Sequence, residues 1–428
     1  MSELENLIYK NMSKQIEKIK LNEDQDFAYK SMLKGQNLFI TGSAGTGKSA
    51  VIKLFYNIFK NSKKISICST TGISSILIGG TTLHSYLGIG IGKGSVYYLT
   101  QKIRKNAFLL KRWKELEILV IDEISMLSPE LFDKLEEIAR NLRKNDTPFG
   151  GIQLILTGDF LQLPCIDSEK FCFEAESWNK CIDNVINFKE IIRQRDEKFQ
   201  ECLNNIRVGN INEKVISILQ SCLDKKLKNK DGIKPTRLCA LNRNVDKINQ
   251  KELDKLDTDI YEYEIELKCN YKTPDFVKDK ITKSSLAQKN LQICVGAQVM
   301  LLCNLDLENK LANGSRGIIV DFVEDLPVVK FLNGQERIID YHIWDLEEDK
   351  KKTTIEQIPL KLAYAISIHK SQGCSLDFVK LDLGNVFEYG QAYVALSRVK
   401  KLSGLSIKNV DLDRIVANPD ALEYYNSL

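Results

Sequence analysis

A glycine-rich segment, Gly42–Ser49 (GSAGTGKS), constrains the fold of this chain more than any other feature. It follows the apolar run Leu38–Ile40 and opens into a stretch with helical apolar spacing. This strand–loop–helix order is the context in which the G-x-x-x-x-G-K-[ST] pattern binds phosphate. Gly42, Gly45 and Gly47 permit backbone angles that let successive N–H groups converge on an anion, and the helix dipole adds attraction. The segment therefore predicts an α/β domain that binds a nucleoside triphosphate.

Residue types in and near this loop predict how the nucleotide and its magnesium ion are held. Lys48 is expected to neutralise the β- and γ-phosphates, and the Ser49 hydroxyl to hold Mg²⁺. Asp122 and Glu123 end another apolar run, ILVIDE, so they are expected at the same edge of the sheet. Asp122 is predicted to hold Mg²⁺ with Ser49, and Glu123 to orient or deprotonate the attacking water. The predicted nucleotide-binding loop residues are Gly42, Ser43, Ala44, Gly45, Thr46, Gly47, Lys48 and Ser49.

Three further residues are candidates for the hydrolysis of the nucleotide. Gln162 follows the strand-like run LILTGD, from which its amide can contact the γ-phosphate or the water. Arg193 and Arg398 lie at opposite ends of a second α/β stretch. An arginine that reaches the γ-phosphate from another domain couples domain closure to hydrolysis.

Apolar runs alternate with helical patterns along the chain, which predicts parallel sheets with crossover helices. In the first 185 residues, Ser128 is a predicted N-cap with Pro129 at the first helical position. A second α/β set is expected from Ile186, and the polar, lysine-rich residues 257–290 are expected to be a connection. Short strand-like runs follow, with Asn313-Gly314 and Asn333-Gly334 as turn signals, so a small antiparallel barrel or sheet is predicted.

The net charge of the 428-residue chain is only +4, but its basic residues are unevenly placed. Between Lys93 and Lys114 there are seven basic residues and no acidic one. Four aromatic residues are interleaved with them: Tyr97, Tyr98, Phe108 and Trp113. Cations for phosphates and rings for stacked bases favour single-stranded nucleic acid. The alternative that these rings belong to the protein core stays open at this point.

Other features narrow the class of protein. The 11 cysteines are scattered singly, which argues against a zinc or iron–sulfur site and favours reduced thiols. The sequence contains no run of 18 apolar residues, and its N-terminus lacks a signal-peptide pattern. We therefore expect a cytoplasmic protein, or a nuclear one if the source is eukaryotic, without a membrane partner.

Seven segments together resemble the Pif-type ("petite integration frequency") DNA helicases of superfamily one, class B. In chain order they are GSAGTGKS, TTGISSILIGGTTLHSYLGIG, IDEISML, PFGGIQLILTGDFLQLP, EIIRQRD, AYAISIHKSQG and QAYVALSRV. VGAQVMLLCN and LANGSRGIIVDF resemble the family's small SH3-like domain. The sequence departs from the family pattern at Cys165, where a second proline is usual, and at Ser367, where threonine is more common.

The resemblance implies two RecA-like parallel-sheet domains with a small inserted basic wedge domain and an SH3-like β-barrel insertion. The expected limits are 1–86 and 116–185 for the first RecA-like domain and 87–115 for the wedge. The second RecA-like domain is expected at 186–275 and 356–428, and the barrel at 276–355. The chain is expected to be close to a minimal motor.

The resemblance also implies site residues. Lys48, Glu123, Gln162, Arg193 and Arg398 are the expected catalytic residues, with Gln162 as γ-phosphate sensor and the two arginines as fingers. Gln25 is expected to read adenine. The expected contacts to single-stranded DNA are Thr81, Thr82, His84, Ser85, Tyr86, His369, Lys370, Ser371 and Gln372.

The function implied is an ATP- and Mg²⁺-dependent DNA helicase that moves 5′ to 3′ on single-stranded DNA as a monomer. Its expected substrates are forked or 5′-tailed duplexes, with G-quadruplexes and RNA–DNA hybrids as further candidates. Two alternatives stay open: a translocase that strips proteins but unwinds poorly, and a non-catalytic subunit that uses ATP as a switch. Glu123, Arg193 and Arg398 argue against the second, while an RNA substrate is compatible with these motifs.

Overall fold

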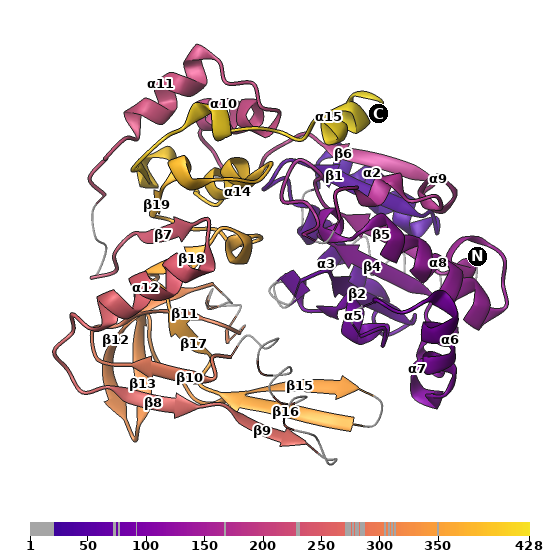
Figure 1. The fold of residues 1–428 in the computed structure, drawn as a ribbon, viewed down its shortest axis with the longest axis horizontal. Coiled ribbons are helices and arrows are strands. Elements are labelled where there is room, and N and C mark those ends of the chain that lie inside the picture. Colours follow the sequence, from indigo (N-terminus) through magenta and orange to yellow (C-terminus); the bar gives the residue numbers. More distant parts are fainter. Residues whose placement is uncertain are drawn as a thin grey trace.

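The computed structural model contains two α/β units, with a β-rich insertion next to the second (Figure 1). It describes residues 21–428 except 72–73, 76–77, 91, 167, 228–231, 270–274, 276–277, 279–281, 283–286, 304, 307–308, 310, 312–313 and 349–350. The predicted α/β fold with two parallel sheets is confirmed. The predicted turn at Asn313-Gly314 includes residue 313, which lies outside the described residues.

The first sheet is parallel and has the strand order β3-β2-β4-β5-β1-β6. Its central strands are continuous apolar runs because both of their faces are covered. Leu38 and Ile40 pack under α2 and α3, whereas Phe39 between them faces α8, as the two-residue strand period requires. The strands are β1 (Leu38–Gly42), β2 (Ile65–Ser69), β3 (Thr81–Thr82), β4 (Ile118–Asp122), β5 (Gln153–Thr157) and β6 (Asn184–Phe188).

Strand β6 pairs with β1 and so belongs to the first sheet. The limit expected between residues 185 and 186 therefore falls inside a strand. An apolar run is compatible with either sheet, and only strand pairing assigns it. The other domain limits stay predictions.

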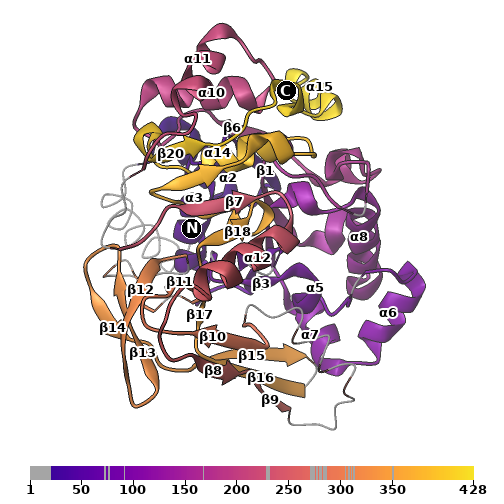
Figure 2. The ribbon, with the colours of Figure 1, turned by 60° about the vertical axis from the view of Figure 1, so that its left-hand side comes forward.

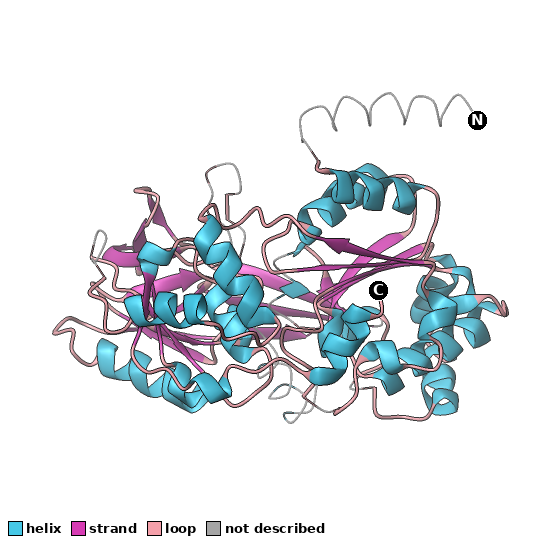
Figure 3. Ribbon diagram, turned by 90° about the horizontal axis from the view of Figure 1, so that it is seen from above, coloured by secondary structure: helices cyan, strands magenta, loops and turns pink. Residues whose placement is uncertain are grey.

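Helices cover both faces of the first sheet (Figure 3). Helix α8 begins as predicted, because Ser128 accepts a hydrogen bond from the Leu131 N–H and Pro129 occupies the first turn. The expected wedge contains α6 and α7, which pack against α8. The helices are α2 (Glu23–Leu33), α3 (Lys48–Phe59), α5 (Leu83–Tyr86), α6 (Val96–Arg104), α7 (Ala107–Glu115), α8 (Pro129–Arg143) and α9 (Trp178–Cys181).

The second sheet is also parallel, with the order β18-β7-β19-β20. Helices α10, α11 and α14 cover one face, and α12 packs on β18 and β7 at the other face (Figure 2). Its strands are β7 (Thr236–Cys239), β18 (Ala365–Ser367), β19 (Val379–Leu381) and β20 (Leu405–Ile407). Its helices are α10 (Glu197–Arg207), α11 (Glu213–Ser221), α12 (Asn242–Leu253) and α14 (Gln391–Ser397).

The insertion between α12 and β18 is made of antiparallel strands in three small sheets. Strands β8 (Tyr261–Glu264) and β9 (Glu266–Cys269) lie where a connection was expected. Their apolar and charged residues alternate, a strand signal that the expectation of a polar connection overlooked, and they pair with the distant strands β10 and β16. The predicted turn at Asn333-Gly334 joins β13 to β14, and an SH3-like barrel stays a prediction. The remaining strands are β10 (Asn290–Ile293), β11 (Gln298–Leu301), β12 (Arg316–Val323), β13 (Leu326–Phe331), β14 (Glu336–Ile338), β15 (His342–Glu348), β16 (Lys351–Gln357) and β17 (Leu360–Leu362).

The last helix, α15 (Pro419–Asn426), returns to the first unit (Figure 1). Ala421 is fully buried in the core beneath the first sheet, and Tyr424 stacks on Phe173 of that unit. The chain thus crosses between the units a second time. Among the described residues, no helix has the length and apolarity needed to span a membrane.

Candidate active site between the two α/β units

The phosphate loop is held against a segment that leads into the second unit. The Gly45 carbonyl accepts hydrogen bonds from the N–H groups of Ile192 and Arg193, at 2.8 and 3.1 Å. Gly45 has a φ of +89°, and a Cβ added there would lie 2.6 Å from the Arg193 Cβ. The site therefore needs glycine both for the backbone angle and for this close approach.

Lys48 lies over the phosphate loop in the first turn of α3. Its Nζ donates to the carbonyls of Gly42 and Ser43, at 2.7 and 3.1 Å. Burial lowers the pKa of Lys48, whereas the carboxylates of Asp159 and Glu123 oppose that shift. A bound polyphosphate would supply further negative charge for this ammonium group.

Asp122 ends β4 and Glu123 follows it, as predicted, and both carboxylates act on the pKa of Lys48. Asp122 Oδ1 accepts hydrogen bonds from the Thr157 hydroxyl and from the Glu123 N–H. Glu123 has left-handed backbone angles, φ 57° and ψ 47°. Burial, together with the neighbouring Asp122 carboxylate, raises the pKa of Glu123 to about 7. A strained residue with a pKa near neutrality is typical of a catalytic base.

Ser49 and Asp122 suit a hard cation beside the phosphates. Both of the Asp122 hydrogen bonds described above use Oδ1, so among the described residues Oδ2 stays available to a cation. Ser49 is exposed in the first turn of α3. A hydroxyl and a carboxylate are oxygen ligands of the kind that Mg²⁺ prefers, usually completed by water and phosphate oxygens.

The two predicted finger arginines lie together in the structure. Arg193 Nη1 donates to the Ser397 carbonyl at 3.2 Å, and Arg398 donates from Nη2 to the Ser397 hydroxyl at 2.7 Å. Burial, together with the nearby Arg398 guanidinium, lowers the pKa of Arg193 to about 10. The two guanidinium groups thus form a cationic pair that an anionic polyphosphate would stabilise.

Gln162, the predicted phosphate sensor, is buried and tied to a carboxylate that the sequence analysis did not single out. Its Nε2 donates to Asp159 Oδ2 at 3.3 Å. Arg207, at the end of α10, makes a bidentate ion pair with Asp159, with distances of 3.0 and 2.7 Å. Tyr425 of α15 donates to Asp159 Oδ1 at 3.3 Å, and the Arg207 guanidinium stacks on its ring. The loop that carries Asp159 and Gln162, here called the sensor loop, therefore contacts both α10 and α15.

Tyr393 and Gln25 also form hydrogen bonds with the phosphate loop. Tyr393 of α14 accepts a hydrogen bond from the Ala44 N–H at 2.7 Å. Gln25 Nε2 donates to the Thr46 carbonyl at 3.0 Å, and its Oε1 accepts from the Asn22 N–H within the capping box of α2. Gln25 thus lies at the rim of the loop, where its adenine role stays a prediction.

The first group of predicted DNA contacts surrounds the short helix α5. Thr82 caps that helix by accepting from the Ser85 N–H, Thr81 is exposed, and burial lowers the pKa of His84. The Arg112 guanidinium lies 4.8 Å from the centre of the Tyr86 ring. The surface around α5 therefore combines polar side chains with the Tyr86 ring and the Arg112 cation.

The second group lies after β18, and its members differ in exposure. Lys370 is exposed, and His369 is half-buried with its Nε2 3.0 Å from Glu388. Ser371 and Gln372 are buried, and Gln372 Nε2 donates to Glu123 Oε2 at 2.8 Å. A residue from the predicted DNA motif thus contacts the predicted catalytic base.

The aromatic residues of the wedge separate into two kinds. Tyr97 and Tyr98 are 75% and 62% exposed, and Phe108 is also exposed. Trp113 is fully buried, and its Nε1 donates to the Leu87 carbonyl at 3.0 Å. The expectation of a stacking ring was therefore wrong for Trp113, because its indole fills the core and its polar atom is satisfied there.

Comparisons with known proteins show the family to which the chain belongs. The PIF1-like helicase family matches residues 20–217, and the 2B domain of the DNA helicase Pif1 matches residues 277–322. The chain is 41% identical to the ATP-dependent DNA helicase PIF1 of Xenopus laevis, over 96% of this chain and 65% of that protein's length.

Solved structures extend the similarity to the fold. The Pif1 helicase from Candida albicans has a TM-score of 0.84 and 36% identity, covering 96% of this chain and 99% of that one. The Pif1 helicase from Bacteroides in complex with ADP-AlF3 and single-stranded DNA has a TM-score of 0.70 and 29% identity, covering 96% and 97%. With a family model that matches residues 20–217 and relatives that are similar over 96% of the chain, the protein belongs to the PIF1-like helicase family.

Proposed function

We propose that this protein is an ATP-driven DNA helicase that tracks 5′ to 3′ on single-stranded DNA. The hydrogen bond between Gln372 and Glu123, which crosses between the two units, is the observation that carries the proposal. It joins the motif expected to hold DNA to the base expected to activate water. Nucleotide hydrolysis that depends on DNA needs such a connection.

In the proposed mechanism, the two units share one nucleotide site. Lys48 and the loop N–H groups would bind the phosphates. Ser49 and Asp122 would hold Mg²⁺, which would supply positive charge beside them. Glu123 takes the proton of the attacking water. Arg193 and Arg398 stabilise negative charge on the γ-phosphate, and Gln162 senses its presence.

The contact between Gln372 and Glu123 gives the order of events. In the present arrangement Gln372 holds one oxygen of Glu123, which restrains the base. A DNA strand that draws the segment after β18 towards itself would release Glu123 for water. Closure and opening of the cleft would then move the strand between two sets of sequence-independent contacts.

The proposed substrates are forked and 5′-tailed duplexes, on which a monomer acts. The Bacteroides relative was crystallised with single-stranded DNA and a phosphate analogue in the same complex. Separating one base pair costs about 1.4 kcal/mol of stacking on average. One hydrolysed ATP per step is therefore sufficient in free energy.

The first experiment compares Lys48→Ala with Lys60→Ala, which changes an exposed lysine at the end of the same helix. Lys48→Ala should abolish DNA-stimulated phosphate release yet still bind a single strand, whereas Lys60→Ala should behave as the wild type. Hydrolysis retained in Lys48→Ala would overturn the site assignment.

The second experiment offers the wild type duplexes with either a 5′ or a 3′ single-stranded tail. Strand separation should require the 5′ tail, and a preference for the 3′ tail would refute the proposed direction. A parallel assay that measures displacement of a DNA-bound protein distinguishes an unwinding enzyme from a stripping translocase. Comparison of G-quadruplex and RNA–DNA hybrid substrates in the same assay tests the broader range.

A further inference from the structure

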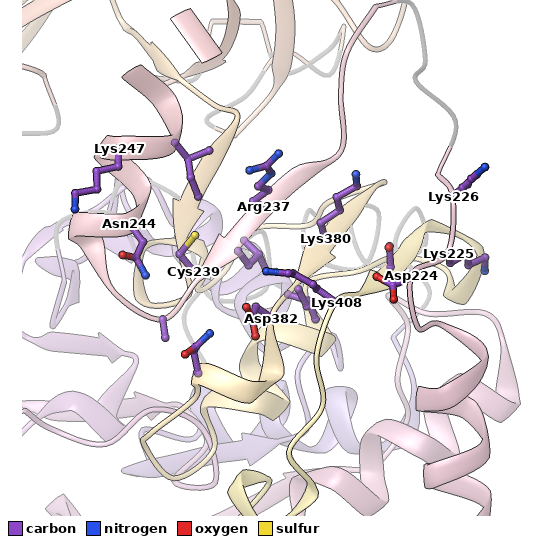
Figure 4. Close-up of a pocket in the computed structure, with 16 residues that line it drawn as sticks. Asp224, Lys225, Lys226, Arg237, Cys239, Asn244, Lys247, Lys380, Asp382 and Lys408 are labelled. Atoms are coloured by element: carbon purple, nitrogen blue, oxygen red, sulfur yellow. The ribbon is translucent and has the colours of Figure 1, made fainter. Parts of the chain in front are cut away.

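A cavity of about 700 Å³ lies on the α12 side of the second sheet (Figure 4). Its walls are α12, one face of β7, β19 and β20, and residues 224–226. In a parallel sheet, such strand faces are normally apolar and covered by helices. Here α12 packs on β18 and β7, and the rest of that face carries polar side chains.

The strand register places like charges side by side in this groove. On β7, Leu238 packs into the core of the second unit, so Arg237 and Cys239 face the groove. Arg237 is paired in register with Lys380 of the adjacent strand β19. Like charges directly opposite on neighbouring strands destabilise a sheet. Arg237 makes only a long ion pair, with its Nη2 4.0 Å from Glu252 Oε1, among the described residues.

The groove as a whole has an excess of positive charge. Two aspartates line it, and the Asp382 carboxylate already accepts hydrogen bonds from Gly384 and Asn409. Within the described parts of the chain, Lys226, Lys247, Lys380 and Lys408 form no ion pair. The six cations that line the groove are Lys225, Lys226, Arg237, Lys247, Lys380 and Lys408. A sequence keeps such an arrangement, against its own stability, where function requires it.

We propose that this groove binds the phosphodiester backbone of a DNA strand, at a place separate from the predicted DNA contacts around α5 and after β18. This inference rests on the proposed function, since a motor that tracks along DNA has strand beyond its cleft. Lysine and arginine supply the sequence-independent attraction to phosphates. Asn244, Asn385 and Ser406, which also line the groove, offer the neutral polar groups that commonly contact phosphate oxygens.

The groove is separate from the site already described. None of the predicted DNA contacts, in β3 and α5 or after β18, lines it. Helix α14, which ends just before Arg398, lies on the opposite face of the second sheet, among the helices that form its core. The groove therefore offers a second contact that lengthens the footprint on DNA.

The experiment uses the full chain with a double variant, Lys380→Gln and Lys408→Gln, and the matched control Lys401→Gln. Lys401 is an exposed lysine of the same unit outside the groove. Fluorescence anisotropy measures binding to single strands of about 10 and about 40 nucleotides, the shorter within the usual range for one binding site. The salt concentration is varied in the measurements with both strand lengths.

We expect the double variant to bind the long strand about tenfold more weakly, with a salt slope reduced by about 1.4 for two lost phosphate contacts. Binding of the short strand should not change, and Lys401→Gln should match the wild type. Equal loss on both lengths, or no loss on either, would overturn the proposal. So would binding of a poly-glutamate peptide that depends on these lysines while DNA binding does not.

The wild type also separates this inference from the proposed function. Failure to unwind a 5′-tailed duplex, with the length-dependent binding intact, would overturn the helicase proposal and leave the groove assignment standing. Thermal unfolding of the double variant checks its fold. Its melting temperature should equal or exceed that of the wild type, because the repulsion between Arg237 and Lys380 is removed.

Discussion

Glu123, the predicted catalytic base, has an unusual backbone conformation that the surrounding structure must maintain. Its position after an apolar strand predicts a catalytic base, and the structure places it beside Asp122, in a left-handed backbone conformation. A left-handed conformation in a residue other than glycine costs about 1 to 3 kcal/mol and is characteristic of functional positions. The rest of the structure must hold it there, and Gln372 supplies one of the bonds that do so.

Replacement of Gln372 by alanine tests this connection at the residue scale. Because Gln372 restrains Glu123 until DNA is bound, its removal should raise basal hydrolysis towards the DNA-stimulated rate, so the stimulation by single-stranded DNA should fall at least about tenfold. Glu123→Gln should lower both rates by about 10² to 10⁴, the usual contribution of a general base. Phosphate release with and without single-stranded DNA measures both effects.

The prediction about Gln372 fails if stimulation in the variant equals that of the wild type. A loss of basal and stimulated rates by the same factor would also contradict it, because Gln372 would then act in the chemical step itself. Binding of a single strand to the variant provides the control for its fold.

At the scale of elements, the first unit follows its sequence closely. Each strand predicted around the phosphate loop forms, and Ser128 and Pro129 begin α8 as expected. These features depend on contiguous residues, through apolar alternation and a local cap. By contrast, β8 and β9 were missed although their residues alternate locally, and only their pairing with β10 and β16 shows which sheets they join.

Helix α12 is held in place in part by ion pairs of its residue Glu252. Burial opposes the ionisation of Glu252 near its end, but hydrogen bonds from Lys234 and Lys255 outweigh that effect and lower its pKa to about 2. The Lys234 and Lys255 distances are 2.7 and 2.6 Å. Because the folded pKa lies below the ordinary value of 4.5, this stabilisation is present above about pH 4.5 and is lost as the pH falls towards 2.

Glu252→Gln should therefore reduce the free energy of unfolding at pH 7 by about 1 to 3 kcal/mol, the usual value for hydrogen bonds to a charged group. The difference from the wild type should shrink as the pH is lowered from 5.5 to about 3.5. Urea unfolding at several pH values measures it. A difference that does not depend on pH would show that packing, and not charge, sets the effect.

At the scale of the whole molecule, the two units are joined by more than the nucleotide site. The Asp159 carboxylate accepts hydrogen bonds from Arg207 of α10 and from Tyr425 of α15. It also accepts one from Gln162, the predicted phosphate sensor. The Tyr425 hydroxyl also lies 2.6 Å from the Thr41 hydroxyl and accepts from the Phe160 N–H. The return of α15 to the first unit therefore ties the end of the chain to the sensor loop.

Tyr425→Phe tests this connection, with Tyr424→Phe as the matched control on the same helix. The change removes the hydroxyl but keeps the ring on which Arg207 stacks. We expect kcat for DNA-stimulated hydrolysis to fall several-fold with a smaller change in the KM for ATP, because the sensor loop is positioned less well. Steady-state kinetics measure both, and equal effects of the two variants would refute the role of the hydroxyl.

The sequence by itself determined the nucleotide loop, the first parallel sheet, the start of α8 and the acidic pair after β4. Each depends on neighbours in the chain, whose backbone angles and spacing suffice to predict it. The tertiary structure decided that Gln372 contacts Glu123, a residue 249 positions away, and that Tyr425 contacts Asp159 across 266. It also placed β6 in the first sheet and aligned Arg237 with Lys380. Such choices depend on which surfaces meet when the chain packs, because a local pattern limits each residue to a face and leaves its partner open.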